Sequence, residues 1–259
     1  MRIAAIVFAA TMVGLGAWGL VDHDFAPIWR PVPRHFTARE GLVWLTGLAA
    51  LAGGLGLLWR RSATLAGGVL AALLLVWMLV FKVPAVVAAP AVAVTWESAG
   101  ETAAIAAGAW ALFATLARAR GPLALVAGDV GLRGARILYA LAMLAFGAAH
   151  LAYVKATAAL VPAWLPDHVA WVWITGVAYI AAGLAMLVGA WARFAATLSA
   201  LQMGLFTLLV WASALLRGHA SADDWSEAVV SWSLTAAGWV VAASYAGAPW
   251  LAVGGRRSR

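Results

Sequence analysis

The sequence predicts an all-α polytopic membrane protein, with eight transmembrane helices arranged as two parallel four-helix repeats. Three observations lead to this fold class. Of the 259 residues, 65% are hydrophobic and only 10% are charged, whereas soluble domains carry about 25% charged residues because their surfaces face water. The chain also contains eight apolar runs, each close to the ~20 residues that a helix needs to cross a bilayer. Finally, Trp, Gly and Pro residues recur at one fixed spacing.

The eight runs follow one another with short polar connections. A backbone within lipid must satisfy its hydrogen bonds internally, so each run is expected to be a helix. The first run, behind Arg2, is short enough to pass for a signal peptide, but its counterpart in the second half of the chain favours a membrane span. The expected spans cover residues 3–21, 41–59, 63–83, 99–117, 136–155, 169–189, 195–216 and 228–245.

Charged residues are divided unevenly between the two sides of these spans. One side holds eleven basic residues and a single acid, Asp129, while the other holds six basic and nine acidic residues. Because cytoplasmic loops are enriched in Lys and Arg, both termini are expected in the cytoplasm, in a bacterial-type plasma (inner) membrane. The net charge of +7 is then a signal of topology and of contact with anionic lipid. Nucleic acid is not an expected partner.

Two residue types narrow the chemistry further. The chain has no cysteine, which excludes cysteine-based cofactors such as thiolate metal sites and thioether-linked haem. It has 16 tryptophans, many of them close to the expected ends of the spans. Indole rings favour the headgroup level of a bilayer, so an aromatic belt is expected, with a stacking surface for a flat ligand as the alternative for a few of them.

The two halves of the chain match at a constant shift of 129 residues. Since each half holds an even number of spans, both halves enter the membrane from the same side, and the repeat is expected to be parallel. The matching pairs are Pro33 with Pro162, Trp44 with Trp173, Thr46-Gly47 with Thr175-Gly176, Gly54 with Gly183, Trp96 with Trp225, and Trp110 with Trp239. The expected units are a first repeat over 1–117, a cytoplasmic linker over 118–134, a second repeat over 135–247 and a basic cytoplasmic tail over 248–259.

Several apolar motifs resemble the DoxX family of four-helix membrane proteins. Residues 136–150, RILYALAMLAFGAAH, resemble that family's first helix. The pattern continues through VPAWLP at 161–166, WITGV at 173–177 and Ala182-Gly183, and the first half repeats it in WLTG at 44–47, Gly53-Gly54 and Lys82-Val-Pro84…Pro90…Trp96. The resemblance covers almost the whole chain as two fused units.

The resemblance implies a small integral membrane protein with an accessory role. Some DoxX members are linked to quinol oxidase or thiosulfate:quinone oxidoreductase complexes, which implies membrane partner subunits and a quinone or lipid as ligand. Many members carry a Glu three residues after the Thr-Gly pair. Ala50 and Tyr179 occupy these positions here, so both halves lack that carboxylate.

A stripe of polar and aromatic residues runs along the fifth span. Its members alternate at steps of three and four residues and therefore share one helix face, which is expected to point into the bundle because polar groups are costly in lipid. The stripe is Arg136, Tyr139, Met143, Phe146, His150, Tyr153 and Thr157. It predicts either helix packing or the wall of a quinone or lipid site formed by Arg136, Tyr139, His150, Tyr153 and, as an outer lid, Trp164.

Charged residues at the outer ends of the spans form two weaker candidates. Lys82 with Glu97 or Glu101 is either a solvated rim or a charge pair that closes the outer mouth of the first half. The triplet Asp22-His23-Asp24 has the donor types of a metal site, but exposed loops commonly contain such residues. A solvated loop is the preferred interpretation of the triplet.

Three functions fit these observations. The first is an accessory or small-ligand binding membrane component, the second a quinone-linked oxidoreductase subunit, and the third a small-molecule transporter, which parallel repeats permit. A stable partner subunit would favour the first, a copurified cofactor or quinone the second, and substrate flux in liposomes the third.

Overall fold

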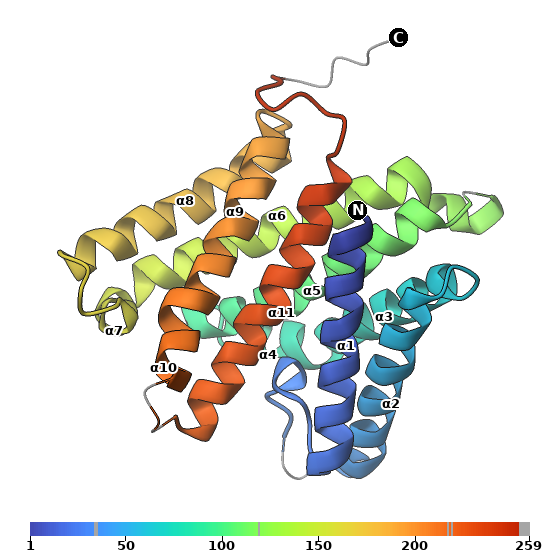
Figure 1. Ribbon diagram of the computed structural model, residues 1–259, viewed down its shortest axis with the longest axis horizontal. Helices are drawn as coiled ribbons and strands as arrows, with labels where there is room; N and C mark the ends of the chain where they lie inside the picture. Colours follow the sequence, from blue (N-terminus) through green and yellow to red (C-terminus); the bar gives the residue numbers. More distant parts are fainter. Residues whose placement is uncertain (34–35, 119, 217, 219, 254–259) are drawn as a thin grey trace.

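The computed structural model describes residues 1–33, 36–118, 120–216, 218 and 220–253, and helices dominate these ranges (Figure 1). The elements in chain order are α1 (Arg2–Asp22), η1 (Pro27–Trp29), α2 (Arg39–Leu58), α3 (Ala63–Trp77), η2 (Met78–Lys82), α4 (Val83–Ala88), α5 (Ala93–Leu116), η3 (Gly121–Leu125), α6 (Gly128–Ala152), α7 (Val154–Leu160), α8 (His168–Val188), α9 (Ala192–Phe206), η4 (Thr207–Ala212), α10 (Ser213–Leu216) and α11 (Ala222–Ser244). The segments η1 and η3 are 3₁₀ turns, and η2 and η4 are π-helical.

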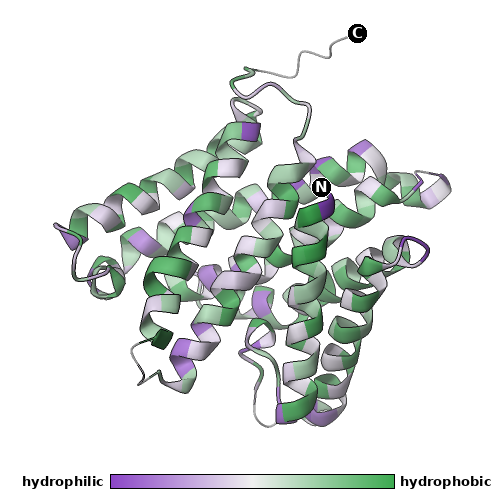
Figure 2. Cartoon of the chain, viewed as in Figure 1, coloured by the Kyte–Doolittle hydropathy of each residue, from purple (hydrophilic) through white to green (hydrophobic). Residues whose placement is uncertain are grey.

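Within the described residues, seven helices are long and apolar enough to cross a membrane, which makes this chain an integral membrane protein. They cover Arg2–Asp22, Arg39–Leu58, Ala63–Ala88, Ala93–Leu116, Gly128–Ala152, His168–Val188 and Ala192–Leu216. The helix α11 is also long, with 23 residues, but three acids in its first two turns lower its hydropathy. Figure 2 shows hydrophobic residues along the helices and hydrophilic ones mostly at their ends and in the connections.

The helices extend beyond several expected bounds. The helix α6 begins at Gly128, inside the segment 118–134 that the sequence predicted as a linker. Gly131 makes this start possible, because a Cβ atom there would collide with the carbonyl of Val126. In the tail expected over 248–259, residues 254–259 lie outside the described residues, as do Arg34, Ala119, Arg217 and two histidines, at 35 and 219.

The bundle is built around α1, α5, α6 and α11. The helices α1 and α11 lie side by side in the middle of Figure 1, with α2 and α3 on one flank and α8 and α9 on the other. The helix α5 packs against α3, α6 and α11, and its Ala-rich stretch from Thr102 to Ala109 is entirely buried. Small side chains let these helices approach closely where lipid gives no hydrophobic drive for association.

Two glycines that lie 129 residues apart, Gly54 and Gly183, each occupy a close contact between two helices. A Cβ atom on Gly54 of α2 would lie 2.6 Å from the carbonyl oxygen of Ala9 in α1. A Cβ atom on Gly183 of α8 would lie 2.7 Å from the carbonyl oxygen of Ala140 in α6. Four pairs of elements also begin exactly 129 residues apart, namely α2 and α8, α3 and α9, η2 and η4, and α5 and α11.

The connection from α1 to α2 folds into the bundle rather than over its surface. The five residues Phe25 to Trp29 are all buried, and the indole Nε1 of Trp77 donates a hydrogen bond of 3.0 Å to the carbonyl of Trp29. The rings of Phe25, Trp29 and Phe81 surround that indole. This inward fold places the next residue, Arg30, beside α5 and η2.

Candidate functional site

A cleft of about 310 Å³ opens between the inserted connection, α5 and α11. Its walls come from three separate parts of the chain. The lining residues are Pro27, Arg30 and Pro31 of the connection, Val94, Glu97, Ser98 and Glu101 of α5, and Ser226, Glu227 and Val230 of α11. Because α5 and α11 contribute residues from their first nine positions, the cleft lies at the end of the bundle where these two helices begin.

Lys82 is buried beside this cleft, where it contacts the lining residues Arg30 and Ser98. It is the last residue of η2, and Pro84 follows two residues later; a proline ring clashes with the carbonyl four residues before it, which favours a wider turn there. The side chain is 3% exposed. Its ammonium group donates hydrogen bonds to the carbonyl of Arg30 and, at 2.8 Å, to the hydroxyl of Ser98.

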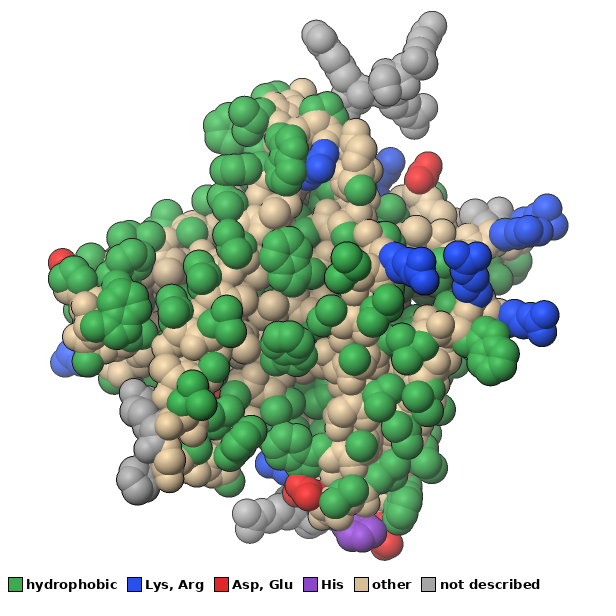
Figure 3. Space-filling view, viewed as in Figure 1, with side chains coloured by type: hydrophobic (Ala, Val, Ile, Leu, Met, Phe, Trp, Pro, Cys, Tyr) green, Lys and Arg blue, Asp and Glu red, His purple; other side chains and the backbone are tan. Residues whose placement is uncertain are grey.

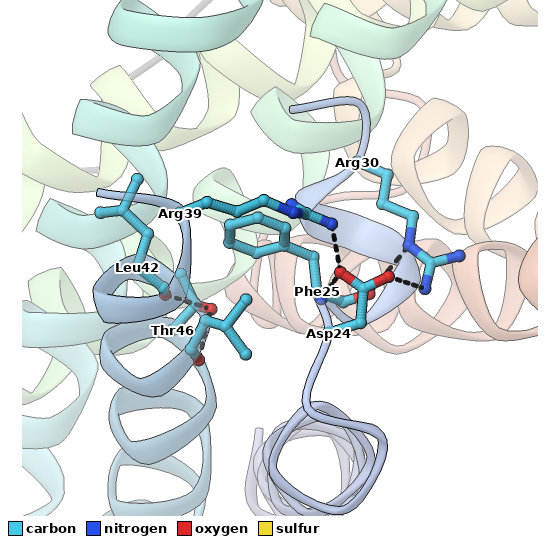
Figure 4. A network of polar contacts seen from close by, with 7 residues as sticks. Asp24, Phe25, Arg30, Arg39, Leu42 and Thr46 are labelled. Atoms are coloured by element: carbon cyan, nitrogen blue, oxygen red, sulfur yellow. Dashed lines mark hydrogen bonds and ion pairs between the residues drawn. The ribbon is translucent and has the colours of Figure 1, made fainter. Parts of the chain in front are cut away.

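Arg30 is held in place by the carboxylate of Asp24 (Figure 4). The Nη2 atom of Arg30 lies 3.3 Å from Asp24 Oδ2, and Nε donates to the carbonyl of Phe25 at 2.9 Å. Arg39 at the start of α2 donates to the other oxygen of Asp24 at 2.5 Å. Both arginines are therefore bound to the same carboxylate, which fixes the connection against α2.

The carboxyl groups of the cleft have no such partners. Within the described part of the chain, Glu97, Glu101 and Glu227 form neither hydrogen bonds nor ion pairs. Glu101 interacts electrostatically with the other two and with Lys82. Lys82 and Arg30 already donate to protein oxygens, so the ionisable groups of the cleft without a hydrogen-bond partner among the described residues are three carboxyl groups, which offer hydrogen-bond acceptors to a ligand.

The structure thus brings the predicted outer-mouth residues together and adds to them. Lys82, Glu97 and Glu101 lie around one cleft, but no ion pair within 4.0 Å joins them among the described residues. Arg30 and Glu227 were not among the predicted site residues. The 129-residue spacing could have pointed to Glu227, because this residue lies 129 positions after Ser98. No sequence pattern around Arg30 indicates its place in the cleft.

The predicted stripe on α6 points into the bundle along most of its length. Tyr139, Met143 and Phe146 are buried, and the Tyr139 hydroxyl lies 3.3 Å from the hydroxyl of Ser199. His150 is half-buried. Its ring stacks on Phe206 with centroids 5.7 Å apart, and its Nδ1 lies 2.9 Å from the carbonyl of Phe146. A carbonyl only accepts, so Nδ1 carries a proton.

The other candidates of the stripe lie apart from His150. The guanidinium of Arg136 lies 3.9 Å from the ring centroid of Tyr245 and donates to the carbonyl and hydroxyl of Ser244. The helix α6 ends at Ala152, so Tyr153 leaves the helical stripe and is 38% exposed. A lid formed by Trp164 would bury that indole, but the side chain is 71% exposed.

The triplet Asp22-His23-Asp24 forms the end of α1. His23 caps the helix in the left-handed region with φ 52°, and its ring lies 5.8 Å from that of Trp44. The carboxylate of Asp24 forms ion pairs with Arg30 and Arg39. Among the described residues, no group of three His, Cys, Asp or Glu side chains is arranged to hold a metal ion.

Residues 139–243 match the model of a family described as a domain of unknown function, DUF8561. The match runs from Tyr139 in α6 to Ala243 in α11 and so lies within the second predicted unit. No curated protein and no solved structure matches the chain.

Proposed function

We propose that this chain is a DoxX-like membrane component that binds a small cationic ligand in the cleft beside Lys82. The observation that carries the proposal is the division of polar groups in the cleft. Its cations are bound to protein oxygens, while Glu97, Glu101 and Glu227 have no hydrogen-bond partner in the described part of the chain. A ligand that brings N–H donors and positive charge would satisfy these carboxyl groups.

The proposed architecture is eight spans in two parallel four-helix units, with α11 as the eighth span and both termini cytoplasmic. The matching start positions of four pairs of elements support the duplication. Equivalent tryptophans also have similar exposure, 47% for Trp96 and 49% for Trp225. Ser98 and Glu227, which this repeat makes equivalent, both line the cleft. The ligand would therefore sit between the two units, at the outer end of their common axis.

A thermal-unfolding experiment on the detergent-purified protein tests the ligand class. Methylammonium chloride should raise the unfolding temperature of the wild type above its value in sodium chloride at equal ionic strength, because a ligand that binds only the folded state stabilises it. Glu101→Gln combined with Glu227→Gln should abolish this rise. The matched control is Glu40→Gln, an exposed acid at the start of α2 outside the cleft. An equal rise in all three proteins contradicts the proposal.

Transport of the same ligand is a second candidate, favoured by the π-helical segments. The segments η2 and η4 interrupt α-helical geometry at equivalent positions, and π-helical turns frequently occur at functional sites. Transporters place their binding sites at the interface between repeats, next to discontinuous helices. Proteoliposomes that contain the protein should take up labelled methylammonium if the protein transports this ligand. Binding without uptake would support the binding role and contradict transport.

A further inference from the structure

Five exposed arginines lie at one end of the first unit. Arg60 and Arg61 occupy the turn between α2 and α3, and Arg118, Arg120 and Arg133 flank the connection from α5 to α6. Figure 3 shows Lys and Arg side chains gathered over these two connections. Within the described ranges none of the five forms an ion pair. Their positive charge is therefore not neutralised by the protein.

The two connections are held next to each other by helix packing. A Cβ atom on Gly67, near the start of α3, would lie 3.2 Å from the backbone nitrogen of Phe113, near the end of α5. The connection after α5 is itself fastened down, because the indole Nε1 of Trp110 donates to the carbonyl of Val126 at 2.8 Å. The arginines therefore lie on two connections whose positions are fixed by these contacts.

Large apolar side chains are exposed among these arginines. They are Trp59, Leu123, Leu125, Val126 and Val130, of which Leu125 is 75% exposed. Exposed apolar side chains are unfavourable in water, and arginines are unfavourable in hydrocarbon. Both are satisfied at the headgroup level, where an apolar side chain reaches the acyl boundary and a guanidinium meets phosphate oxygens.

We infer that this surface binds the phosphate groups of anionic phospholipids. Charge complementarity selects the partner, since the single acid of the region, Asp129, leaves a strong positive excess that anionic headgroups neutralise. The apolar side chains favour a lipid over free phosphate, because only a lipid offers them acyl chains. This surface lies at the opposite ends of α2 and α5 from the Lys82 cleft, so the inference does not depend on the proposed ligand.

Native mass spectrometry of the full chain released from nanodiscs tests the inference. In nanodiscs of phosphatidylcholine mixed with phosphatidylglycerol, the wild type should retain phosphatidylglycerol preferentially. Replacing all five arginines by Gln should lower that preference at least about tenfold, because each basic residue near an anionic surface contributes to lipid attraction. Replacing them by Lys should keep most of it. Lys155→Gln, an exposed cation in α7, serves as the control and should leave the preference unchanged.

Three outcomes would overturn the inference. The first is a wild type that retains both lipids equally. The second is a correctly folded Gln variant, judged by circular dichroism and size exclusion, that keeps the full preference. The third is displacement of phosphatidylglycerol by inorganic phosphate, which would assign the surface to a free anion instead of a lipid.

Discussion

Gly108 of α5 faces Ala237 of α11, the residue exactly 129 positions further along the chain. A Cβ atom on Gly108 would lie 2.8 Å from the Cβ atom of Ala237. Two equivalent residues of a twofold repeat touch each other only near the rotation axis, so this contact is compatible with the proposed repeat. The cleft lies toward the beginnings of the same two helices, where Ser98 and Glu227 form another equivalent pair.

Gly108→Ala should destabilise the protein. The added methyl group would meet both the Cβ and the Cα of Ala237, and α5 and α11 must separate to admit it. Overpacking of this kind costs about 1–3 kcal/mol. Thermal unfolding in mild detergent measures the loss. Gly14→Ala is the matched control, because that position in α1 has nothing within 4 Å and Ala is the better helix former. Equal unfolding temperatures for the two variants would contradict the close contact.

Arg136→Gln should lower stability without changing what copurifies. The side chain is engaged with Ser244 and Tyr245 at the end of α11, and hydrogen bonds to charged groups contribute about 1.5–3 kcal/mol. Arg136→Lys should recover only part of this stability. A Lys ammonium is not planar, so it cannot stack on the ring of Tyr245 and also donate hydrogen bonds to Ser244 as the guanidinium does. Thermal unfolding and native mass spectrometry check both points. Full recovery by Lys would argue against this geometry.

His150→Phe should leave the protein nearly as stable as the wild type, whereas His150→Ala should destabilise it clearly. A phenyl ring keeps the stack on Phe206 and loses one hydrogen bond of about 1 kcal/mol, but Ala leaves a cavity. Mass spectrometry of extracted lipids and quinones provides the second measurement. If the stable Phe variant loses a bound quinone that the wild type retains, His150 is part of a ligand wall and not only of the packing.

Reporter fusions should place both termini in the cytoplasm. The distribution of basic residues predicts cytoplasmic reporters after Arg61 and Arg120, and exterior reporters near Arg30 and Asp223. Paired alkaline phosphatase and fluorescent-protein fusions at the four positions give opposite signals on the two sides. The reverse pattern at any two of them would refute the proposed orientation.

The sequence by itself predicted the membrane class and most of the helices. Apolar length and the need to satisfy backbone hydrogen bonds in lipid are local properties, so most ends of the expected spans lie within about three residues of a helix end. The helices α5 and α11 begin six residues, and α6 eight residues, before the expected bounds. Two of the differences have local causes. The start of α6 at Gly128 depends on a close approach of Gly131 to Val126, and the stripe stops at Tyr153 because the backbone leaves helical geometry there.

Only the tertiary structure decided which charged residues meet. Lys82 was a candidate from its place at the end of a span, but its contact with Arg30, 52 residues earlier, exists because the connection after α1 folds into the bundle. Glu227 joins Glu97 because α11 packs on α5. Such contacts depend on how distant segments pack, and no hydropathy pattern or residue spacing within a single segment carries that information.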